Sequence, residues 1–441
     1  MINKKTLGIT LFEDQLVRSY LLSDNFRLLL VLVESFEVTL FTTSKIGSEL
    51  ELKMPKNLLS VVKIQCVTQY NETILQKIVG FGLRQAEPGP TPRLKSQMAR
   101  VKGEISIFGL AIRILANIIF PNRLVVNVLR KMYLILHKSN TRYTLSNNFD
   151  GIDLLFVTSL TNFSADVPIA LSIKSRGKPV FGTVRSWDNL VTHGSLRVAP
   201  DLFIAHSNFM ADSAKYSQFL DMAKIKIMTT PSYRLEFLPK DKVSKELVIY
   251  GCMGPFANPD EQNAIQWLTE NWAKNFPSTK LLILEHPAFP IKLIPSNLPK
   301  NISITTIRYS DSTLTKYYGL LASAKLVIAG GTTVLLDAAF VKTPIAAIAF
   351  DFESQNPLLS ALRSFDIRPH TKNFVEKCKA PLLFSREDII DIVSKSLKSP
   401  ISIPKLENVE FLIGNIDIDF CYALKETFVS SMSRKDESCL E

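Results

Sequence analysis

Short apolar runs alternate with longer amphipathic stretches through the second half of the chain. Five runs are predicted as strands: residues 246–250, 280–285, 302–307, 325–329 and 344–350. Helices are predicted between them, over residues 258–276, 312–324 and 332–341. Largely apolar strands that alternate with helices of this length are typical of a parallel sheet covered on both faces. The second half is therefore predicted to be a Rossmann-type domain.

The first half repeats this alternation less regularly. Strands are predicted over residues 6–11, 36–42, 152–159, 179–184, 202–206 and 225–229, and a long helix over residues 15–32. A polar stretch at residues 233–244 is predicted to link the halves. The sequence thus predicts an α/β protein with two Rossmann-like domains, residues 1–235 and 245–425, facing each other across a central cleft. Residues 426–441 are expected to be a polar tail.

The composition is that of a soluble globular protein. Of 441 residues, 46% are hydrophobic and 21% are charged, which excludes disordered, collagenous and coiled-coil chains. The five cysteines are scattered without metal or redox spacing, which favours a reduced, cytoplasmic chain. No apolar run is long enough for a membrane span, and the acidic residues Glu13 and Asp14 argue against a signal peptide.

The basic charge is concentrated in one segment. Residues 93–142 contain ten Lys or Arg residues against the single acid Glu104, so they carry +9 of the net charge of +11. Two apolar runs within the segment, residues 105–120 and 124–136, are separated by Pro121, which favours two helices. Polar side chains fall on one narrow stripe of each predicted helix: Ser106, Arg113 and Asn117 in the first, and Asn127, Arg130, Lys131 and Lys138 in the second.

Two interpretations of this basic amphipathic insertion stay open. Broad apolar faces with basic stripes suit helices that lie in the anionic surface of a membrane. Core helices whose basic edges face water have the same pattern. Nucleic acid is a poorer partner, because the basic residues are interleaved with aliphatic ones and few aromatic side chains are present for base stacking.

A glycine turn follows the fourth predicted strand of the second half. Gly330 and Gly331 allow close approach of the backbone to a ligand, and Thr332 and Thr333 open the next helix. The N–H groups and dipole of such a helix start favour phosphate. Asp337, four or five residues into the helix, is placed to reach a ribose hydroxyl. A plain helix cap after a glycine turn would account for the same residues without any ligand.

Two further polar sites follow predicted strands. His286 comes directly after the second predicted strand of the same half, where an imidazole can contact a diphosphate. Arg185, Trp187, Asp188 and Asn189 follow a strand of the first half. A Trp ring offers a flat face to a sugar, and its polar neighbours offer contacts to hydroxyl or phosphate groups. A structural histidine, and a half-buried Trp on a solvated turn, are the alternatives.

Three segments together resemble bacterial GT-B glycosyltransferases of surface-polysaccharide assembly. They are VRSWDNLVTHG at residues 184–194, LEHP at residues 284–287 and VIAGGTTVLLDAAFVKTPIAAI at residues 327–348. Relatives of that group include the CDP-glycerol glycerophosphotransferases of teichoic acid synthesis. Two residues depart from the pattern, since Asp337 stands where the group usually has Glu and His193 where it often has Lys.

The resemblance implies a GT-B fold and transfer of a sugar or polyol phosphate from a nucleotide-activated donor to a lipid-linked glycan. The second domain is expected to hold the donor diphosphate on residues 330–333 and His286, with no resident cofactor. The first domain is expected to hold the acceptor, with Asp188 or Glu13 as the base. The protein would then lie peripherally on the inner face of the cytoplasmic membrane. No metal is expected, because no carboxylate, His or Cys cluster has ligand spacing.

Two other functions stay open. A non-hydrolysing sugar-nucleotide 2-epimerase has the same two-domain fold. Such an enzyme handles a soluble substrate, so it has no evident use for the basic amphipathic insertion. A non-catalytic partner in polysaccharide assembly is the second alternative. Release of nucleotide from a panel of nucleotide sugars would separate these functions.

Overall fold

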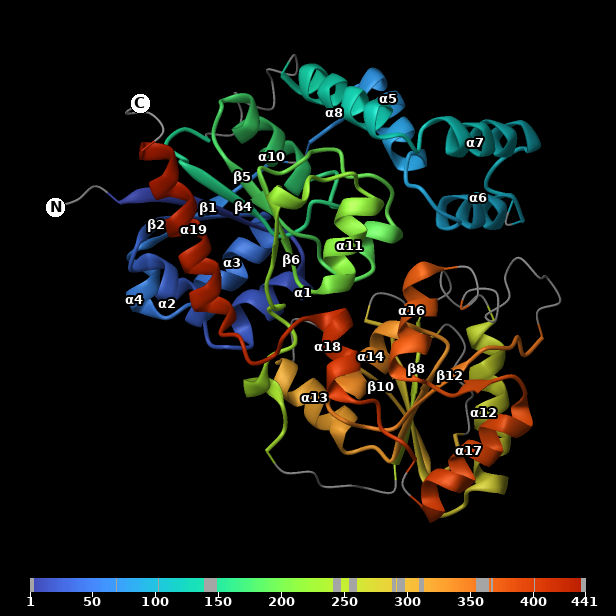
Figure 1. The fold of residues 1–441 in the computed structure, drawn as a ribbon. Helices are drawn as coiled ribbons and strands as arrows, with labels where there is room; N and C mark the ends of the chain where they lie inside the picture. The colour runs from blue at the N-terminus through green and yellow to red at the C-terminus, as the bar shows by residue number, and fades with distance from the viewer. Residues whose placement is uncertain are drawn as a thin grey trace. The chain divides into compact units, whose positions relative to one another are not determined.

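The chain folds into two compact units, each built around one parallel sheet with helices on its faces (Figure 1). Unit 1 comprises Met1–Ser96, Ile105–Arg234 and Ile413–Glu441, and unit 2 comprises Gln97–Glu104 and Leu235–Leu412. The computed structural model describes residues 4–68, 70–101, 103–138, 149–240, 247–253, 260–287, 291, 298–308, 313–353, 365, 368–399 and 401–437. The predicted α/β class is confirmed.

The sheet of unit 1 has seven parallel strands. They are β1 (Lys5–Leu11), β2 (Phe36–Thr42), β3 (Val62–Cys66), β4 (Leu154–Val157), β5 (Val180–Gly182), β6 (Leu202–Ala205) and β7 (Ile225–Ile227). Their order in space is β3-β2-β1-β4-β5-β6-β7. Leu7 of β1 pairs with Val38 of β2 on one side and Leu154 of β4 on the other, so the strand order reverses between β1 and β4. Ligands of open parallel sheets bind at the carboxyl ends of the strands at such a reversal.

Short helices connect these strands. They are α1 (Asp14–Val17), the π-helical turn η1 (Arg18–Leu22), α2 (Arg27–Val33), α3 (Ser44–Lys53), α4 (Lys56–Leu59), α10 (Asp166–Ser175), α11 (Asn208–Tyr216), and the 3-10 turns η2 (Asn189–Val191) and η3 (Met222–Lys224). The prediction of one helix over residues 15–32 is wrong. Asn25 and Phe26 adopt positive φ angles of 54° and 64°, which ends the first helical segment before α2 begins.

Four helices are inserted between β3 and β4. They are α5 (Ile74–Gln85), α6 (Thr91–Val101), α7 (Ile107–Ile119) and α8 (Arg123–Lys138). The Thr73 side chain and Gln76 form a capping box at the start of α5, and the Ser106 hydroxyl caps α7 by accepting from the Gly109 amide at 3.0 Å. The predicted break at Pro121 is confirmed, while the helical insertion begins at α5, before residue 93.

The C-terminal helix α19 (Phe420–Glu437) packs in unit 1, although residues up to 425 were predicted to belong with the second domain and the rest to a polar tail. Phe420, Leu424 and Phe428 are spaced four residues apart and are fully buried in the core beside β1 and β4. The Phe428 ring lies 5.4 Å from that of Phe156. This apolar stripe, which continues past residue 425, is the reason for the difference.

Unit 2 has six parallel strands. They are β8 (Leu247–Gly251), β9 (Lys280–Glu285), β10 (Ile302–Thr306), β11 (Leu326–Ala329), β12 (Ile345–Ile348) and β13 (Leu382–Leu383), in the order β10-β9-β8-β11-β12-β13. This is the order of a Rossmann fold, and it reverses between β8 and β11. Its helical elements are η4 (Leu235–Phe237), α12 (Glu261–Asn275), α13 (Leu314–Ala322), α14 (Thr332–Phe340), α16 (Pro369–Cys378), α17 (Arg386–Lys398) and α18 (Leu406–Ile413). All five strands predicted in this half are present.

Candidate functional site

In unit 2 the glycine turn lies at the point where the strand order reverses. β11 ends at Ala329, Gly330 and Gly331 form the turn, and α14 begins at Thr332. Gly331 is the N-cap of α14 and, having no side chain, makes no cap hydrogen bond to the first turn of this helix. Thr333 is exposed at the same end. The main-chain N–H groups of this first turn are therefore the groups that can bind an anion here.

The side chain of Met253 lies against this turn. A Cβ atom on Gly331 would clash with the Met253 Cε and Sδ atoms, so Gly331 provides the room for that side chain. Met253 follows β8, the strand beside β11. A thioether on an unbranched side chain changes rotamer readily. A ligand that approaches the turn would meet this side chain, which can change rotamer.

His286 and Asp337 of unit 2 lie in different surroundings. His286 directly follows β9 and is half-buried. Asp337 is buried within α14, and its Oδ2 accepts a hydrogen bond from the Tyr317 hydroxyl at 2.8 Å. Asp337 therefore has a protein partner within unit 2, and its contact with a ribose stays a prediction. Residues 254–259, 288–290 and 292–297, which follow β8 and β9, lie outside the described residues.

Two further carboxylates of unit 2 were not singled out in the sequence analysis. The Glu261 Oε1 atom accepts from the Met253 amide at 2.7 Å, and the Glu285 Oε1 atom accepts from the Ile291 amide at 2.8 Å. Burial raises the pKa of the Cys252 thiol, and the charges of Glu261 and Glu285 raise it further. Both carboxylates hold backbone segments in place. Glu285 stands in the LEHP segment, but no sequence signal marked Glu261.

In unit 1 the structure brings together two predicted site residues. Glu13 lies in the loop after β1, and Arg185 lies three residues after β5. The Arg185 guanidinium forms an ion pair with the Glu13 carboxylate. The Glu13 side chain is 23% exposed and that of Arg185 is 34% exposed. A carboxylate held by a guanidinium, and still open to solvent, can act as a base or as a hydrogen-bond acceptor for a sugar hydroxyl.

A third group of this cluster, Asp166, was missed. Asp166 starts α10 after β4 and is fully buried, with its Oδ1 accepting a hydrogen bond from the Thr10 hydroxyl. Burial raises the pKa of Asp166 to about 8, and the nearby Glu13 charge raises it as well. Among the described residues the Asp166 Oδ2 atom has no hydrogen-bond partner. The one sequence signal was its place at a helix start after a predicted strand, which is common for Asp without any function.

The predicted sugar contacts of Trp187 and Asn189 are not what the structure shows. Trp187 is only 5% exposed, and its ring packs 5.5 Å from that of Phe209, so it is a core residue. Asn189 is buried, and its Oδ1 accepts from the Ser186 amide at 3.1 Å. Asp188 is half-buried beside the Thr192 hydroxyl. The apolar and amide side chains of this segment therefore stabilise the loop, while Arg185 and Asp188 keep exposed atoms.

Hydrogen bonds from other segments of unit 1 stabilise the loop that contains Arg185 and Asp188. Gln218 donates to the carbonyls of Leu190 and Gly194 at 2.7 and 3.2 Å and accepts from the Leu196 amide at 2.7 Å. Lys95 donates to the Thr192 carbonyl. Burial lowers the pKa of His193, which stands where the transferases that this segment resembles often have Lys, to about 4. His193 is thus neutral at pH 7 and cannot replace a lysine charge.

No metal centre is evident in the part of the chain that the structure describes, where no three His, Cys, Asp or Glu side chains are grouped to hold an ion. Two groups of described residues are candidates for chemistry: the start of α14 in unit 2 for anion binding, and the Glu13–Arg185 pair in unit 1 for proton transfer.

No protein-family model matches the sequence, and no curated protein matches it. Solved structures match the fold over nearly the whole chain. A Listeria monocytogenes protein assigned as a UDP-N-acetylglucosamine 2-epimerase has a TM-score of 0.51 at 10% identity, over 99% of this chain and 98% of that chain. UDP-GlcNAc 2-epimerase from Neisseria meningitidis has a TM-score of 0.48 at 12% identity, over 98% and 100%. A glycotransferase of kitacinnamycin has a TM-score of 0.47 at 8% identity, over 94% and 95%.

At these identities the likeness to the Listeria protein shows the fold alone. That fold is the GT-B type, with two Rossmann-like domains. The predicted GT-B architecture is confirmed at this level. The closer resemblance to CDP-glycerol glycerophosphotransferases is not supported by these comparisons. By its three-dimensional structure, the chain is a protein of GT-B fold.

Proposed function

We propose that this chain is an enzyme that acts on a nucleotide-activated sugar. The observation that carries the proposal is the Gly330–Gly331 turn, which opens α14 where the order of a Rossmann sheet reverses. Such a helix start binds a diphosphate through backbone N–H groups and the helix dipole. His286, at the same edge, is proposed to contact that diphosphate. The structurally similar Listeria protein carries the name of an enzyme of UDP-N-acetylglucosamine, which supports this substrate class.

Two reactions of nucleotide sugars are candidates. Epimerisation at C2 of the sugar is supported by the fold likeness to an epimerase over the whole chain. Transfer to a lipid-linked glycan in surface-polysaccharide biosynthesis, at the inner face of the cytoplasmic membrane, is supported by the resemblance of residues 184–194, 284–287 and 327–348 to transferases. In either reaction the nucleotide sugar is the substrate, so the proposal needs no resident cofactor.

Each reaction requires a base. Transfer removes a proton from the acceptor hydroxyl, and epimerisation removes the hydrogen from C2. We propose Glu13 as this base, because its carboxylate is partly exposed and Arg185 fixes its position. Burial raises the pKa of the neighbouring Asp166 to about 8, which favours a neutral carboxyl beside Glu13 at pH 7. Asp188 is the second choice, since the Thr192 hydroxyl lies 3.5 Å from its Oδ2 atom and holds it toward the loop.

One experiment separates the reactions. The protein is incubated with UDP-N-acetylglucosamine in deuterated water and followed by proton NMR. An epimerase incorporates deuterium at C2 and forms the C2 epimer with no acceptor present. A transferase leaves C2 unexchanged and releases nucleotide only when an acceptor glycolipid is added. If no nucleotide sugar in a panel of uridine, cytidine and guanosine donors reacts by either route, the enzymatic proposal is wrong and the non-catalytic alternative gains support.

Nucleotide binding is expected to depend on His286. Replacing His286 by Ala removes one charge-assisted contact to the diphosphate, which costs about 1.5–3 kcal/mol, or roughly ten- to a hundredfold in affinity. Calorimetry with nucleoside diphosphates measures this loss. Lys398→Ala is the matched control, because Lys398 is an exposed cation in the last turn of α17, away from the carboxyl ends of the strands. If the two variants bind nucleoside diphosphates with equal affinity, His286 does not contact the diphosphate.

A further inference from the structure

Helix α8 exposes large apolar side chains and buries three polar ones, Arg130, Tyr133 and His137, while its other cations stay exposed. The outward residues Leu124, Val128, Met132 and Ile135 are 45% to 75% exposed. The inward residues are Val126, Arg130, Tyr133 and His137, and all four are buried. The sequence interpretation in which Arg130 belongs to a basic stripe facing water or lipid is therefore wrong. A soluble helix normally has the opposite arrangement, so the outward face requires a partner.

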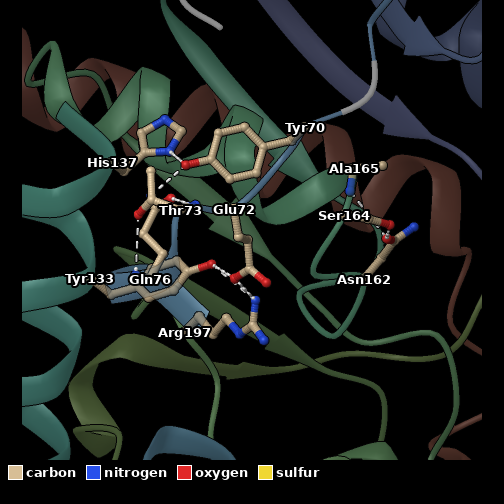
Figure 2. A network of polar contacts seen from close by, with 10 residues as sticks. All are labelled: Tyr70, Glu72, Thr73, Gln76, Tyr133, His137, Asn162, Ser164, Ala165 and Arg197. Atoms are coloured by element: carbon tan, nitrogen blue, oxygen red, sulfur yellow. Dashed lines mark hydrogen bonds and ion pairs between the residues drawn. The ribbon is translucent and has the colours of Figure 1, made fainter. Parts of the chain in front are cut away.

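A buried polar network fixes this orientation (Figure 2). The Tyr133 hydroxyl and the Arg197 guanidinium both bind the Glu72 carboxylate, and Arg197 also donates to the Tyr133 hydroxyl at 2.9 Å. One turn further along α8, the His137 Nδ1 atom lies 3.1 Å from the Tyr70 hydroxyl. Rotating α8 to bury its apolar face would leave these groups without partners, which is costly for buried polar atoms.

Two more contacts attach α8 to the body of unit 1. Arg130 donates from Nε to the Leu196 carbonyl at 2.8 Å and from Nη2 to the Gln218 carbonyl at 3.0 Å. The His137 Nε2 atom lies 2.9 Å from the Ser172 hydroxyl of α10. Burial lowers the pKa of His137 to about 4, so this residue stays neutral at pH 7. The outward apolar face of α8 is therefore a preformed surface.

Exposed apolar side chains are also present on α5, which packs beside α8, and on α7, which packs beside α5 (Figure 1). On α5 the exposed side chains include Ile74 and Ile78, while Gln76 is buried and bonded to the Tyr70 hydroxyl. On α7 they include Phe108 and Ile118, while Asn117 is buried. Large exposed apolar surfaces of this kind mark interaction sites on soluble proteins.

The charges of these three helices indicate what the surface meets. Residues 74–85 and 105–138 contain no Asp or Glu. Lys77, Arg123 and Lys131 are exposed on the helices that carry the apolar side chains. A second copy of this surface would bring like charges together, which disfavours a dimer through this face. Apolar side chains bordered by cations, with no anion among them, match an anionic lipid surface.

The helices do not have the form of a membrane span. Among the described residues no single helix is long and apolar enough to cross a bilayer, and α7 and α8 reach that length only together, with a bend of 112° between them. The buried face of α8 is bonded to unit 1 through Arg130, Tyr133 and His137. These contacts would be lost if α8 crossed the hydrocarbon core.

We propose that the outward face of α5, α7 and α8 docks unit 1 on an anionic bilayer, with the apolar side chains inserted at the level of the headgroups. The inference rests on the proposed function, because a lipid-linked acceptor would give the docking its purpose. Vesicle binding itself can be measured without acceptor or donor. If the wild type binds nucleotide but not vesicles, the docking proposal alone is contradicted. If it binds vesicles but not nucleotide, the catalytic proposal alone is contradicted.

The test is flotation of the full chain with vesicles of phosphatidylcholine, with or without phosphatidylglycerol. The wild type is expected to float with the anionic vesicles. Replacing Ile78, Phe108, Leu124 and Ile135 by Ser should lower binding more than tenfold. The matched control replaces Leu52, Val61, Met222 and Phe384 by Ser, since these are also exposed apolar residues, and it should bind like the wild type. All substituted side chains are exposed, so thermal unfolding should change little.

A second variant isolates the electrostatic part. Arg123→Gln with Lys131→Gln should lower binding to anionic vesicles by about fivefold per residue, and leave binding to neutral vesicles unchanged. The buried Arg130 is left intact, because its loss would disturb the fold. Equal flotation of the wild type and the four-Ser variant would overturn the proposal. So would a wild-type dimer in sedimentation that the four-Ser variant abolishes, because the face would then belong to a second copy.

Discussion

Replacing Glu13 by Gln is expected to lower turnover by about 10²- to 10⁴-fold, which is the usual contribution of a general base. The Gln side chain keeps the size of Glu and can still accept a hydrogen bond from Arg185, so the loop after β1 should keep its conformation. It cannot accept a proton at neutral pH. The loss should therefore appear in kcat, measured as nucleotide release or as C2 exchange, with little change in KM.

Asp14→Asn is the matched control for this variant. Asp14 is the next residue, its side chain is 37% exposed, and it lies 3.8 Å from Lys45 instead of in the Glu13 cluster. The control removes the same charge from the adjacent position, the first residue of α1, and should keep turnover within a fewfold of the wild type. Turnover of Glu13→Gln equal to that of the control would show that Glu13 is not the base, and Asp188 would be tested next.

Most of the fold could be predicted from the sequence because its strands are buried on both faces. A strand such as β9 or β11 is a short, continuous apolar run bounded by polar residues, and between two helices such a run is nearly always a buried strand. The glycine turn after β11 could be placed for the same reason, since it directly follows such a run. A turn that directly follows such a strand can therefore be placed from the sequence, even where its contacts cannot.

The direction of a helix face could not be predicted in the same way. The sequence shows that polar residues of α8 share one side of the helix. Periodicity does not say whether that side faces water or the core, so either side of α8 could be the buried one. The choice depends on partners distant in sequence, Glu72 and Arg197, which satisfy Tyr133 inside unit 1. Arg130 was misassigned for this reason.

Asp166 could not be predicted for a related reason. Thr10 lies in β1 and Asp166 starts α10, far apart in sequence, and only the pairing of β1 with β4 brings them together. Trp187 shows the opposite error, since an aromatic residue among polar ones suggested a binding platform. Trp187 follows β5, but the Phe209 ring that buries it belongs to α11, which follows β6. Local composition indicates candidates, while long-range pairing decides between them.

The stability of unit 1 is expected to fall as the pH rises from about 5 to about 8, because of Asp166. The unfolded chain loses this proton near the ordinary pKa of about 3.9, whereas burial holds the pKa of Asp166 in the folded chain at about 8. Between these values the folded state binds a proton that the unfolded state has lost. The free energy of unfolding then falls by about 1.4 kcal/mol per pH unit, or about 4 kcal/mol over this range.

Asp166→Asn should abolish this dependence, because the amide stays neutral and its Oδ1 can still accept from the Thr10 hydroxyl. Other buried groups also titrate: Glu87, whose pKa is raised to about 7 by burial, and His137, His193 and His206, whose pKa values burial lowers to about 4. The wild type and the variant share these groups, so their effects cancel in the difference between the two unfolding free energies.

The measurement is urea unfolding of both proteins at several pH values. Unfolding is monitored through hydrogen exchange of the β1 and β4 amides, so that unit 1 is observed separately. The advantage of Asp166→Asn should grow with pH and level off above about pH 8. Asp153→Asn is the control, because contacts with the Thr6 amide and Lys178 lower the pKa of Asp153 and keep it ionised throughout this range. Its difference from the wild type should not change with pH. If the Asp166→Asn difference is equally flat, the Asp166 carboxyl is ionised in the folded chain, and the charge distribution assigned to the Glu13 cluster is wrong.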